Sequence, residues 1–320
     1  MPSIESLKLP ERPEMDFTLV RNGMDYLSSA VLYLTGKIQV PIEAWPLWPE
    51  AAKGPVFSQP APLWLSDRHL KYGVLHLQAA TEVLLKARLV REHWSLVFKD
   101  PGSATRADYE QGKFKSCDTA TALSRLTGIV GLPITAKERK YINDLGETRN
   151  ALTHYGDTAN AYLVEARAAR VLGFLVDFVP RHLHPALSRD AEFVATTMEA
   201  VREELRHISA LVRNRMQDLA DELAPVSEAT VHCPSCRQVA LVVGGGAAPV
   251  TCRFCLRVFV TPTEAAAYYW NNVLDADDSL GVQDCPACDV QDVVVMASTA
   301  ADLTTDAPLC FHCGTVYEEK

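Results

Sequence analysis

Eight of the nine cysteines in this 320-residue chain form four Cys-x-x-Cys pairs near its C-terminal end. A Cys-x-x-Cys turn places two thiolates on one side of a metal ion, and two such turns complete the tetrahedral shell that zinc prefers. The sequence therefore predicts two structural zinc ions. The expected ligands are Cys233, Cys236, Cys252 and Cys255 for one ion, and Cys285, Cys288, Cys310 and Cys313 for the other. Four protein ligands leave no open position, so neither site is expected to be catalytic.

The spacing of the pairs favours sequential pairing. Fifteen residues separate the pairs of the first set and twenty-one separate those of the second. Crossing Cys233/Cys236 with Cys285/Cys288 stays open as an alternative, but sequential pairing closes shorter loops. The pattern resembles tandem zinc ribbons over roughly residues 230–320, and such ribbons bind nucleic acid or protein. The ninth cysteine, Cys117, has no neighbouring base in sequence and is predicted to be a buried thiol.

A second set of chemically capable residues lies in the segment Arg149-Asn150-Ala151-Leu152-Thr153-His154. An arginine fork matches phosphate, and a histidine moves a proton near neutral pH. Together they suit metal-independent RNA cleavage, in which the 2′-hydroxyl attacks the adjacent phosphorus and the arginine stabilises the developing charge. Five residues of ideal helix turn the chain roughly 140° past a full turn, so Arg149 and His154 converge only near a helix end or across a dimer.

Two segments resemble HEPN domains. Residues 75–87, LHLQAATEVLLKA, resemble their second helix, and residues 147–156, ETRNALTHYG, resemble their Arg-Asn-x3-His signature. The resemblance covers roughly residues 16–182 and implies a helical dimer. It further implies a ribonuclease of a defence or toxin–antitoxin type system, with a composite site made by two subunits.

By the same resemblance, each polar residue of the motif has a role. Arg149 would bind phosphate, and His154 would act as general base or acid. Asn150 would orient His154 or the RNA, and Glu147 would orient Arg149. Other readings stay open: Arg149 could pair with Glu147 or Asp144 while His154 caps a helix end. The protein would then be a non-enzymatic dimerising adaptor whose ribbons bind a protein partner or nucleic acid.

The positions of helix formers and breakers predict an all-α bundle over residues 1–225, interrupted by a loop at 39–63 that is rich in proline and tryptophan. Helices are expected at 16–34, 66–92, 118–129, from 135 towards 154, from about 160 to 180, and at 188–223. Ser66, Asp67, Thr135 and Ser188 are the candidate N-caps, and either Asp157 or Asn160 starts the helix that ends before Pro180. Two small β units follow, a first ribbon at 226–274 and an acidic second ribbon at 275–320.

The charge of −9 is concentrated in the tail. Residues 226–320 carry 4 Lys/Arg against 12 Asp/Glu, which leaves 27 against 28 for the first 225 residues. The acidic second ribbon therefore favours a protein partner over phosphate, and disfavours a DNA-binding regulator. It could also fold back over Arg149. In the first ribbon, Arg237, Arg253 and Arg257 could touch nucleic acid or form a solvated rim. No apolar run suits a membrane span or a signal peptide, so we expect a cytoplasmic protein.

Overall fold

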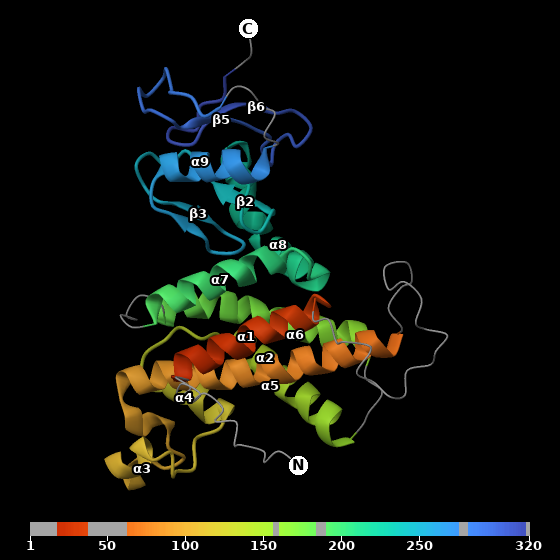
Figure 1. Ribbon diagram of the computed structural model, residues 1–320, viewed down its shortest axis with the longest axis vertical. Helices are drawn as coiled ribbons and strands as arrows, with labels where there is room; N and C mark the ends of the chain where they lie inside the picture. Colours follow the sequence, from red (N-terminus) through yellow and green to blue (C-terminus); the bar gives the residue numbers. More distant parts are fainter. Residues whose placement is uncertain (1–17, 38–62, 156–159, 184–189, 275–280, 318–320) are drawn as a thin grey trace, which may run out of the picture.

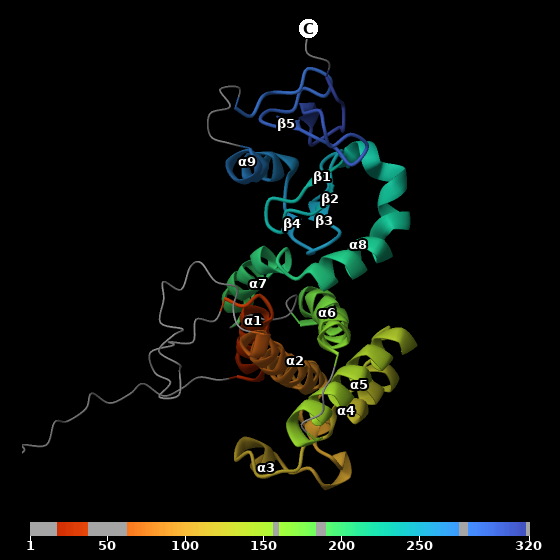
Figure 2. The same cartoon turned by 90° about the vertical axis from the view of Figure 1, so that its right-hand side faces the viewer.

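The computed structural model contains a helical body and, at the end of the long axis that holds the C-terminus, two small β units stacked on it (Figure 1, Figure 2). It describes residues 18–37, 63–155, 160–183, 190–274 and 281–317. The predicted class, a helical bundle followed by small β domains, is confirmed at this level. The Pro/Trp-rich loop at 39–63 lies outside the described residues, except for Leu63. Within the described ranges, no helix is both long and apolar enough to cross a bilayer.

The long helix α2 (Leu63–Glu92) is the centre of the helical body. It packs against α1 (Leu19–Leu34), α4 (Thr119–Gly128), α5 (Ala136–Asn150) and α6 (Ala161–Phe178). Because α2 has partners on several sides, its buried side chains are not confined to one stripe. They are Val74, Leu77, Ala80, Thr81, Leu84, Leu85, Lys86, Ala87 and Leu89.

Between α2 and α4 the chain makes short helical turns instead of a plain loop. These are the 3-10 turns Trp94–Val97 and Pro101–Ser103 and the short helix α3 (Arg106–Glu110). The Trp94 ring contacts Phe98 and Tyr109, at centroid distances of 5.8 and 5.6 Å. Trp94 thus packs among aromatic side chains, as expected for a residue that fills a core.

Most helix starts follow from their capping residues. The side chains of Asp118, Thr135 and Asn160 accept bonds from the first-turn amides of α4, α5 and α6. The sequence predicted the cap at Thr135, the helix start at Asp118, and Asn160 as one of two possible starts. Thr135 forms a reciprocal capping box with Glu138. The expectation for α2 is wrong: the helix begins at Leu63, so Ser66 and Asp67 lie inside its first turns.

The predicted helix at 188–223 is two helices, α7 (Ala191–Leu205) and α8 (Ser209–Leu223). The break falls at Ile208, whose backbone (φ −99°, ψ 87°) is not helical and whose side chain is buried. Figure 2 shows α8 leaving the direction of α7 and rising towards the β units. The helical periodicity of apolar residues continues across the break, so no local pattern predicts it. Ser188 lies outside the described residues.

The first ribbon is an antiparallel sheet in the order β1-β2-β3-β4, followed by helix α9 (Pro262–Val273). Its strands are β1 (Thr230–His232), β2 (Val239–Val242), β3 (Val250–Cys252) and β4 (Val258–Phe259). The second ribbon pairs β5 (Val294–Ala297) with β6 (Ala307–Cys310), with Val295 opposite Leu309.

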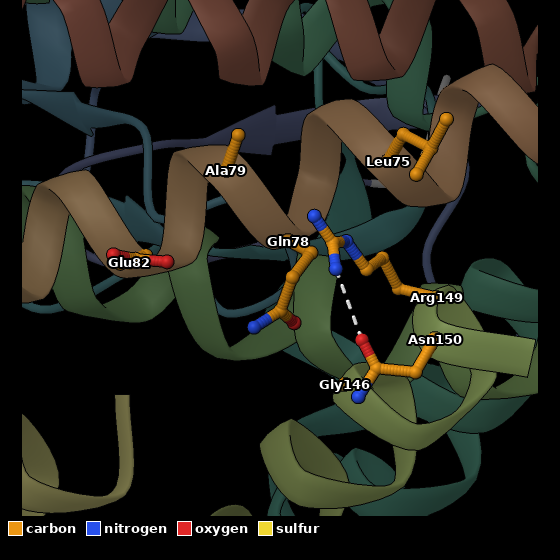
Figure 3. Close-up of a pocket in the computed structure, with 7 residues that line it drawn as sticks. All are labelled: Leu75, Gln78, Ala79, Glu82, Gly146, Arg149 and Asn150. Carbon is orange, nitrogen blue, oxygen red and sulfur yellow. Dashed lines mark hydrogen bonds between the residues drawn. The ribbon is translucent and has the colours of Figure 1, made fainter. Parts of the chain in front are cut away.

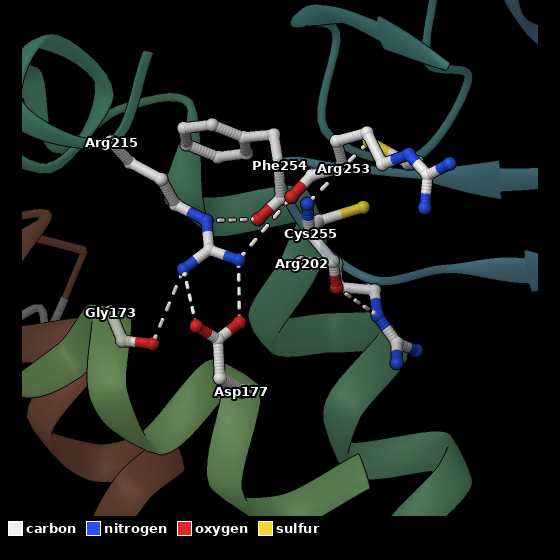
Figure 4. A network of polar contacts seen from close by, with 8 residues as sticks. Gly173, Asp177, Arg202, Arg215, Arg253, Phe254 and Cys255 are labelled. Carbon is white, nitrogen blue, oxygen red and sulfur yellow. Dashed lines mark hydrogen bonds and ion pairs between the residues drawn. The ribbon is translucent and has the colours of Figure 1, made fainter. Parts of the chain in front are cut away.

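The first ribbon is joined to the helical body by arginines of α7 and α8 (Figure 4). Arg202 Nε donates to the Cys255 carbonyl at 3.0 Å. Arg215 donates to the Phe254 carbonyl and binds both carboxylate oxygens of Asp177 on α6, at 2.6 and 3.1 Å. Bidentate guanidinium–carboxylate pairs are among the stronger polar contacts in proteins. The Cys252–Cys255 turn of the first ribbon is therefore fixed to α6, α7 and α8.

The charged residues of the first ribbon also face the helical body. Arg257 pairs with Glu199 on α7 at 2.8 Å, and Ser235 donates to the same carboxylate at 2.8 Å. Arg253 pairs with Glu222 on α8 at 3.2 Å. Two of the three arginines considered for nucleic acid thus serve intramolecular contacts.

The two ribbons meet at Gly244 and Gly314. Gly244 N donates to the Phe311 carbonyl at 3.0 Å, and Gly246 N donates to the His312 carbonyl at 2.8 Å. Gly244 has φ +80°, and a Cβ atom there would lie 2.9 Å from Gly314 Cα. Gly246 has a similar φ of +67°, but open space surrounds the corresponding Cβ position. Only Gly244 is therefore required by a close approach of two backbones.

These two glycines form a matched pair for testing the ribbon–ribbon junction. We expect Gly246→Ala to cost only left-handed strain, about 1 kcal/mol, whereas Gly244→Ala adds an overlap with backbone and costs about 3 kcal/mol. Hydrogen exchange of the β5 and β6 amides measures the difference. Equal exchange in the two variants would contradict the junction described here.

Candidate functional site

Two four-cysteine clusters are present, and each consists of the sequential pairs. The Sγ atoms of each cluster all lie within 4.8 Å of one another. The Sγ atoms of Cys233 and Cys255 are 3.8 Å apart, and those of Cys236 and Cys252 are 3.7 Å apart. In the second cluster, the Cys285–Cys313 and Cys288–Cys310 distances are 3.7 and 3.9 Å. The crossed pairing left open by the sequence is therefore not the arrangement of the structure.

These sulfur–sulfur distances fit metal ligands and exclude disulfides. A disulfide has an S–S length of about 2.05 Å. A tetrahedral shell with metal–sulfur bonds of about 2.3 Å has edges of about 3.8 Å. Both clusters thus have the dimensions of a shell able to hold one metal ion.

All four Cys-x-x-Cys turns have the same backbone geometry. The amide after each second cysteine donates to the carbonyl of the first, over 2.8–3.0 Å. The donating residues are Arg237, Leu256, Asp289 and Gly314, and each has a left-handed φ between 56° and 74°. A left-handed conformation costs a residue with a side chain about 1–2 kcal/mol, so three of the four turns carry strain that the closed shell must hold.

The electrostatics of the first cluster suit a bound cation. All four of its cysteines have no exposed surface, and burial raises the pKa of Cys252 well above its ordinary value. Four thiolates in such a space repel one another, and a bound metal ion relieves the repulsion and deprotonates the thiols outright. In the second cluster, partial burial opposes ionisation, but hydrogen bonds with the Tyr317 hydroxyl, the Cys288 thiol and backbone amides lower the pKa of Cys285 to about 6.

Two histidines that neighbour cysteine ligands in the sequence stay outside both clusters. Among the described residues, neither His232 nor His312 belongs to a group that can hold a metal ion. Cys117 is a buried free thiol, as predicted, and burial raises its pKa.

The Arg149 motif begins on the last turn of α5, whose position is fixed by α6. Ile142 and Leu145 are buried on the inner face of α5. Arg167 on α6 donates to the Thr148 hydroxyl at 2.8 Å, and Arg170 stacks on the Tyr141 ring at 5.1 Å. These contacts fix the position of Arg149 along the length of α2.

Arg149 and Asn150 line a cavity of about 280 Å³ between α5 and α2 (Figure 3). The other lining residues are Leu75, Gln78, Ala79, Glu82 and Gly146. Arg149 Nη1 donates to Asn150 Oδ1 at 3.0 Å. Within the described residues no carboxylate pairs with Arg149, and Asp144 pairs with Lys140 at 2.9 Å. The structure thus gives Arg149 a neutral partner in place of the ion pair considered from the sequence.

His154 and Glu147 do not line this cavity. Both are exposed, and His154 lies in a π-helical turn, Ala151–Tyr155, that continues α5. The ideal-helix geometry assumed for the motif therefore does not apply beyond Asn150, because a π turn contains more residues than an α turn. π turns inside helices occur frequently at functional sites. One chain brings Arg149 and Asn150 together and leaves His154 open to solvent.

The second ribbon lies far from this cavity. It is stacked on the first ribbon, at the end of the molecule opposite α4 and α5 (Figure 1, Figure 2). The Ala300 amide donates to the Thr230 carbonyl at 2.7 Å, and Val295, Leu309 and Phe311 join the main core. In this arrangement the acidic ribbon does not cover Arg149.

Several residues of these sites were missed from the sequence. Gln78 and Glu82 lie in the segment that resembles a HEPN helix, but nothing local marks them as cavity residues. In the sequence, Arg202 and Arg215 resemble ordinary charged residues on a helix surface. In the structure, both donate to carbonyls of the Cys252–Cys255 turn.

Comparisons of the chain with protein-family models, with curated proteins and with solved structures gave no match. The HEPN resemblance therefore rests on the motif, its spacing and the helical setting.

The two clusters differ in access, which predicts ordered metal loss. Cys288 and Cys313 are partly exposed, whereas every cysteine of the first cluster is buried. We expect a chelator to remove the metal of the second ribbon first, and that of the first ribbon only after local unfolding. Stopped-flow chelation with elemental analysis measures the two phases.

Two cysteine variants serve as controls for this order. Cys288→Ser should abolish only the fast phase, whereas Cys252→Ser should remove the slow phase and destabilise the helical body. Release of both ions in one phase would contradict the difference in access.

Proposed function

We propose that the protein is a HEPN-type endoribonuclease that needs no catalytic metal ion and acts in a defence or toxin–antitoxin type system. The observation that carries this proposal is Arg149, which lines an open cavity with Asn150 and has no carboxylate partner among the described residues. A guanidinium placed in this way is available to a phosphate and to the charge that develops on it.

The proposed reaction needs a group that moves protons, and His154 is the candidate. It is exposed on the π turn directly after Arg149 and Asn150, outside the cavity of its own chain. As general base it would take the proton of the 2′-hydroxyl, and as general acid it would protonate the leaving 5′-oxygen. Asn150 would orient the RNA or His154. Glu147, an exposed residue two positions before Arg149, would orient Arg149 only through rearrangement.

We assign zinc to the two four-cysteine clusters. Soft thiolate ligands in a closed tetrahedral shell are typical of structural zinc. The ribbons would then act as recognition modules, the acidic second ribbon meeting a protein partner of positive charge.

A homodimer would complete the active site. At the start of α6, shortly after the motif, Tyr162 is 83% and Leu163 is 50% exposed. Large apolar side chains left in water beside a motif suggest an interface, and a second copy would cover them. A twofold contact of this kind would bring the Arg149 and His154 residues of two subunits into one groove.

The nuclease proposal predicts cleavage of single-stranded RNA in buffer without divalent metal, with products that end in 2′,3′-cyclic phosphate. We expect Arg149→Ala and His154→Ala each to reduce the rate about 100-fold or more, because each removes a group that acts in the transition state. End-labelled RNA and mass spectrometry of the products measure both effects.

Lys140→Ala is the matched control, since Lys140 lies on the same helix outside the cavity and should leave the rate unchanged. Circular dichroism and zinc content check the fold of each variant. RNA that stays intact with the wild type, or equal cleavage by Arg149→Ala, would overturn the enzyme in favour of the second candidate. That candidate is a non-enzymatic adaptor, supported by the balanced charge of the helical body.

The dimer proposal predicts that Tyr162→Asp lowers the mass measured by light scattering from that of a dimer to that of a monomer, because a buried unpaired carboxylate is costly. Leu303→Asp, at a 54% exposed position of the second ribbon, is the control and should leave the mass unchanged. A monomeric wild type would refute the proposed composite site.

A further inference from the structure

The cavity beside Arg149 has two walls of different chemistry (Figure 3). The α2 wall is formed by Leu75, Gln78, Ala79 and Glu82, which share one helix face at spacings of three and four residues. The α5 wall presents the guanidinium of Arg149 and the amide of Asn150. Hydrogen-bond donors for an anion thus lie on one wall, and a carboxylate and a carbonyl oxygen on the other.

Gln78 has an unsatisfied acceptor at this cavity. Its Oε1 atom is buried and has no hydrogen-bond partner among the described residues. Figure 3 shows the Gln78 side chain extending from α2 towards Asn150 on α5. Because an unpaired buried acceptor is unfavourable, a group that donates a hydrogen bond is expected here when the cavity is filled.

Glu82 adds a second acceptor one helical turn further along α2. Lys86 donates to its Oε1 at 2.5 Å and also to the Ser116 hydroxyl at 2.9 Å. Since Lys86 is almost fully buried, this pair fixes the Glu82 carboxylate on the cavity wall. The α2 wall therefore holds the Glu82 carboxylate in place beside Gln78, and both side chains offer an acceptor to a ligand that carries N–H groups.

The cavity suits one nucleotide better than a larger ligand. Its volume of about 280 Å³ lies just below the range of pockets for drug-sized molecules, about 300–1,000 Å³. Leu75 and Ala79 give the α2 wall apolar surface against which a planar ring can pack. Single-stranded RNA is read in this manner, through apolar packing of a base and hydrogen bonds to its edge.

We propose that Gln78 and Glu82 form a nucleobase subsite that selects a base with an exocyclic amino group, next to the RNA phosphate held by Arg149. This inference rests on the proposed function and adds a specificity to it. Cytosine presents an amino donor where uracil presents a carbonyl acceptor, so the two bases form a matched pair for the test. An acceptor-lined wall binds the first and repels the second.

The experiment measures binding of fluorescent hexacytidylate and hexauridylate to the His154→Ala protein, which leaves the RNA intact. We expect hexacytidylate to bind about tenfold more tightly, the effect of one well-placed base contact. Gln78→Met in the same background should abolish the preference while keeping the hexauridylate affinity. Gln217→Met, on the exposed face of α8, is the matched control and should retain the preference.

The possible results separate this inference from the proposed nuclease. Equal binding of the two oligonucleotides, no binding of either, or a preference that persists in Gln78→Met would each overturn the subsite. Cleavage by the wild type would still support the nuclease in all three cases. If the wild type cuts no RNA but the Gln78-dependent preference is found, the subsite stands and the nuclease fails.

Discussion

The contact on which the molecule depends is that between Arg215 and the metal-binding turn of the first ribbon. Arg215 donates to the Phe254 carbonyl on one side and to the Asp177 carboxylate on the other. The turn is rigid only if four thiolates close around a metal ion, because its left-handed residues are unfavourable otherwise. Arg215 and Asp177 link α8 to α6 directly, and a metal ion bound in the ribbon would hold the turn that packs on this pair.

From α6 the same constraint extends to the cavity. Arg167 on α6 bonds Thr148, which directly precedes Arg149 on α5. The distance between α5 and α2 sets the position of Arg149 relative to Gln78 and Glu82. The first ribbon is therefore a structural part of the helical body. The second ribbon packs on the first through backbone hydrogen bonds at Gly244, Gly246 and Thr230.

What the sequence could predict was local in origin. Cys-x-x-Cys spacing predicted the two clusters and their sequential pairing, and Asp118, Thr135 and Asn160 predicted three helix starts, because each acts within a few residues. The sequence did not predict contacts between residues that are distant along the chain. The break at Ile208 lets α8 reach the ribbon, and Arg215 and Asp177 meet across 38 positions of sequence. Neither has a signature in spacing or composition.

The same distinction explains why the candidate active site was found only in part. Arg149 and Asn150 are neighbours in a recognisable motif, so the sequence named them. Gln78 lies on another helix, and its unpaired oxygen becomes visible only when α2 and α5 are placed together. His154 shows the opposite case, since the π turn separates it from the cavity of its own chain. The proposed catalysis by Arg149 and His154 would thus require either a second subunit or a movement of that turn, and the exposed Tyr162 and Leu163 favour the subunit.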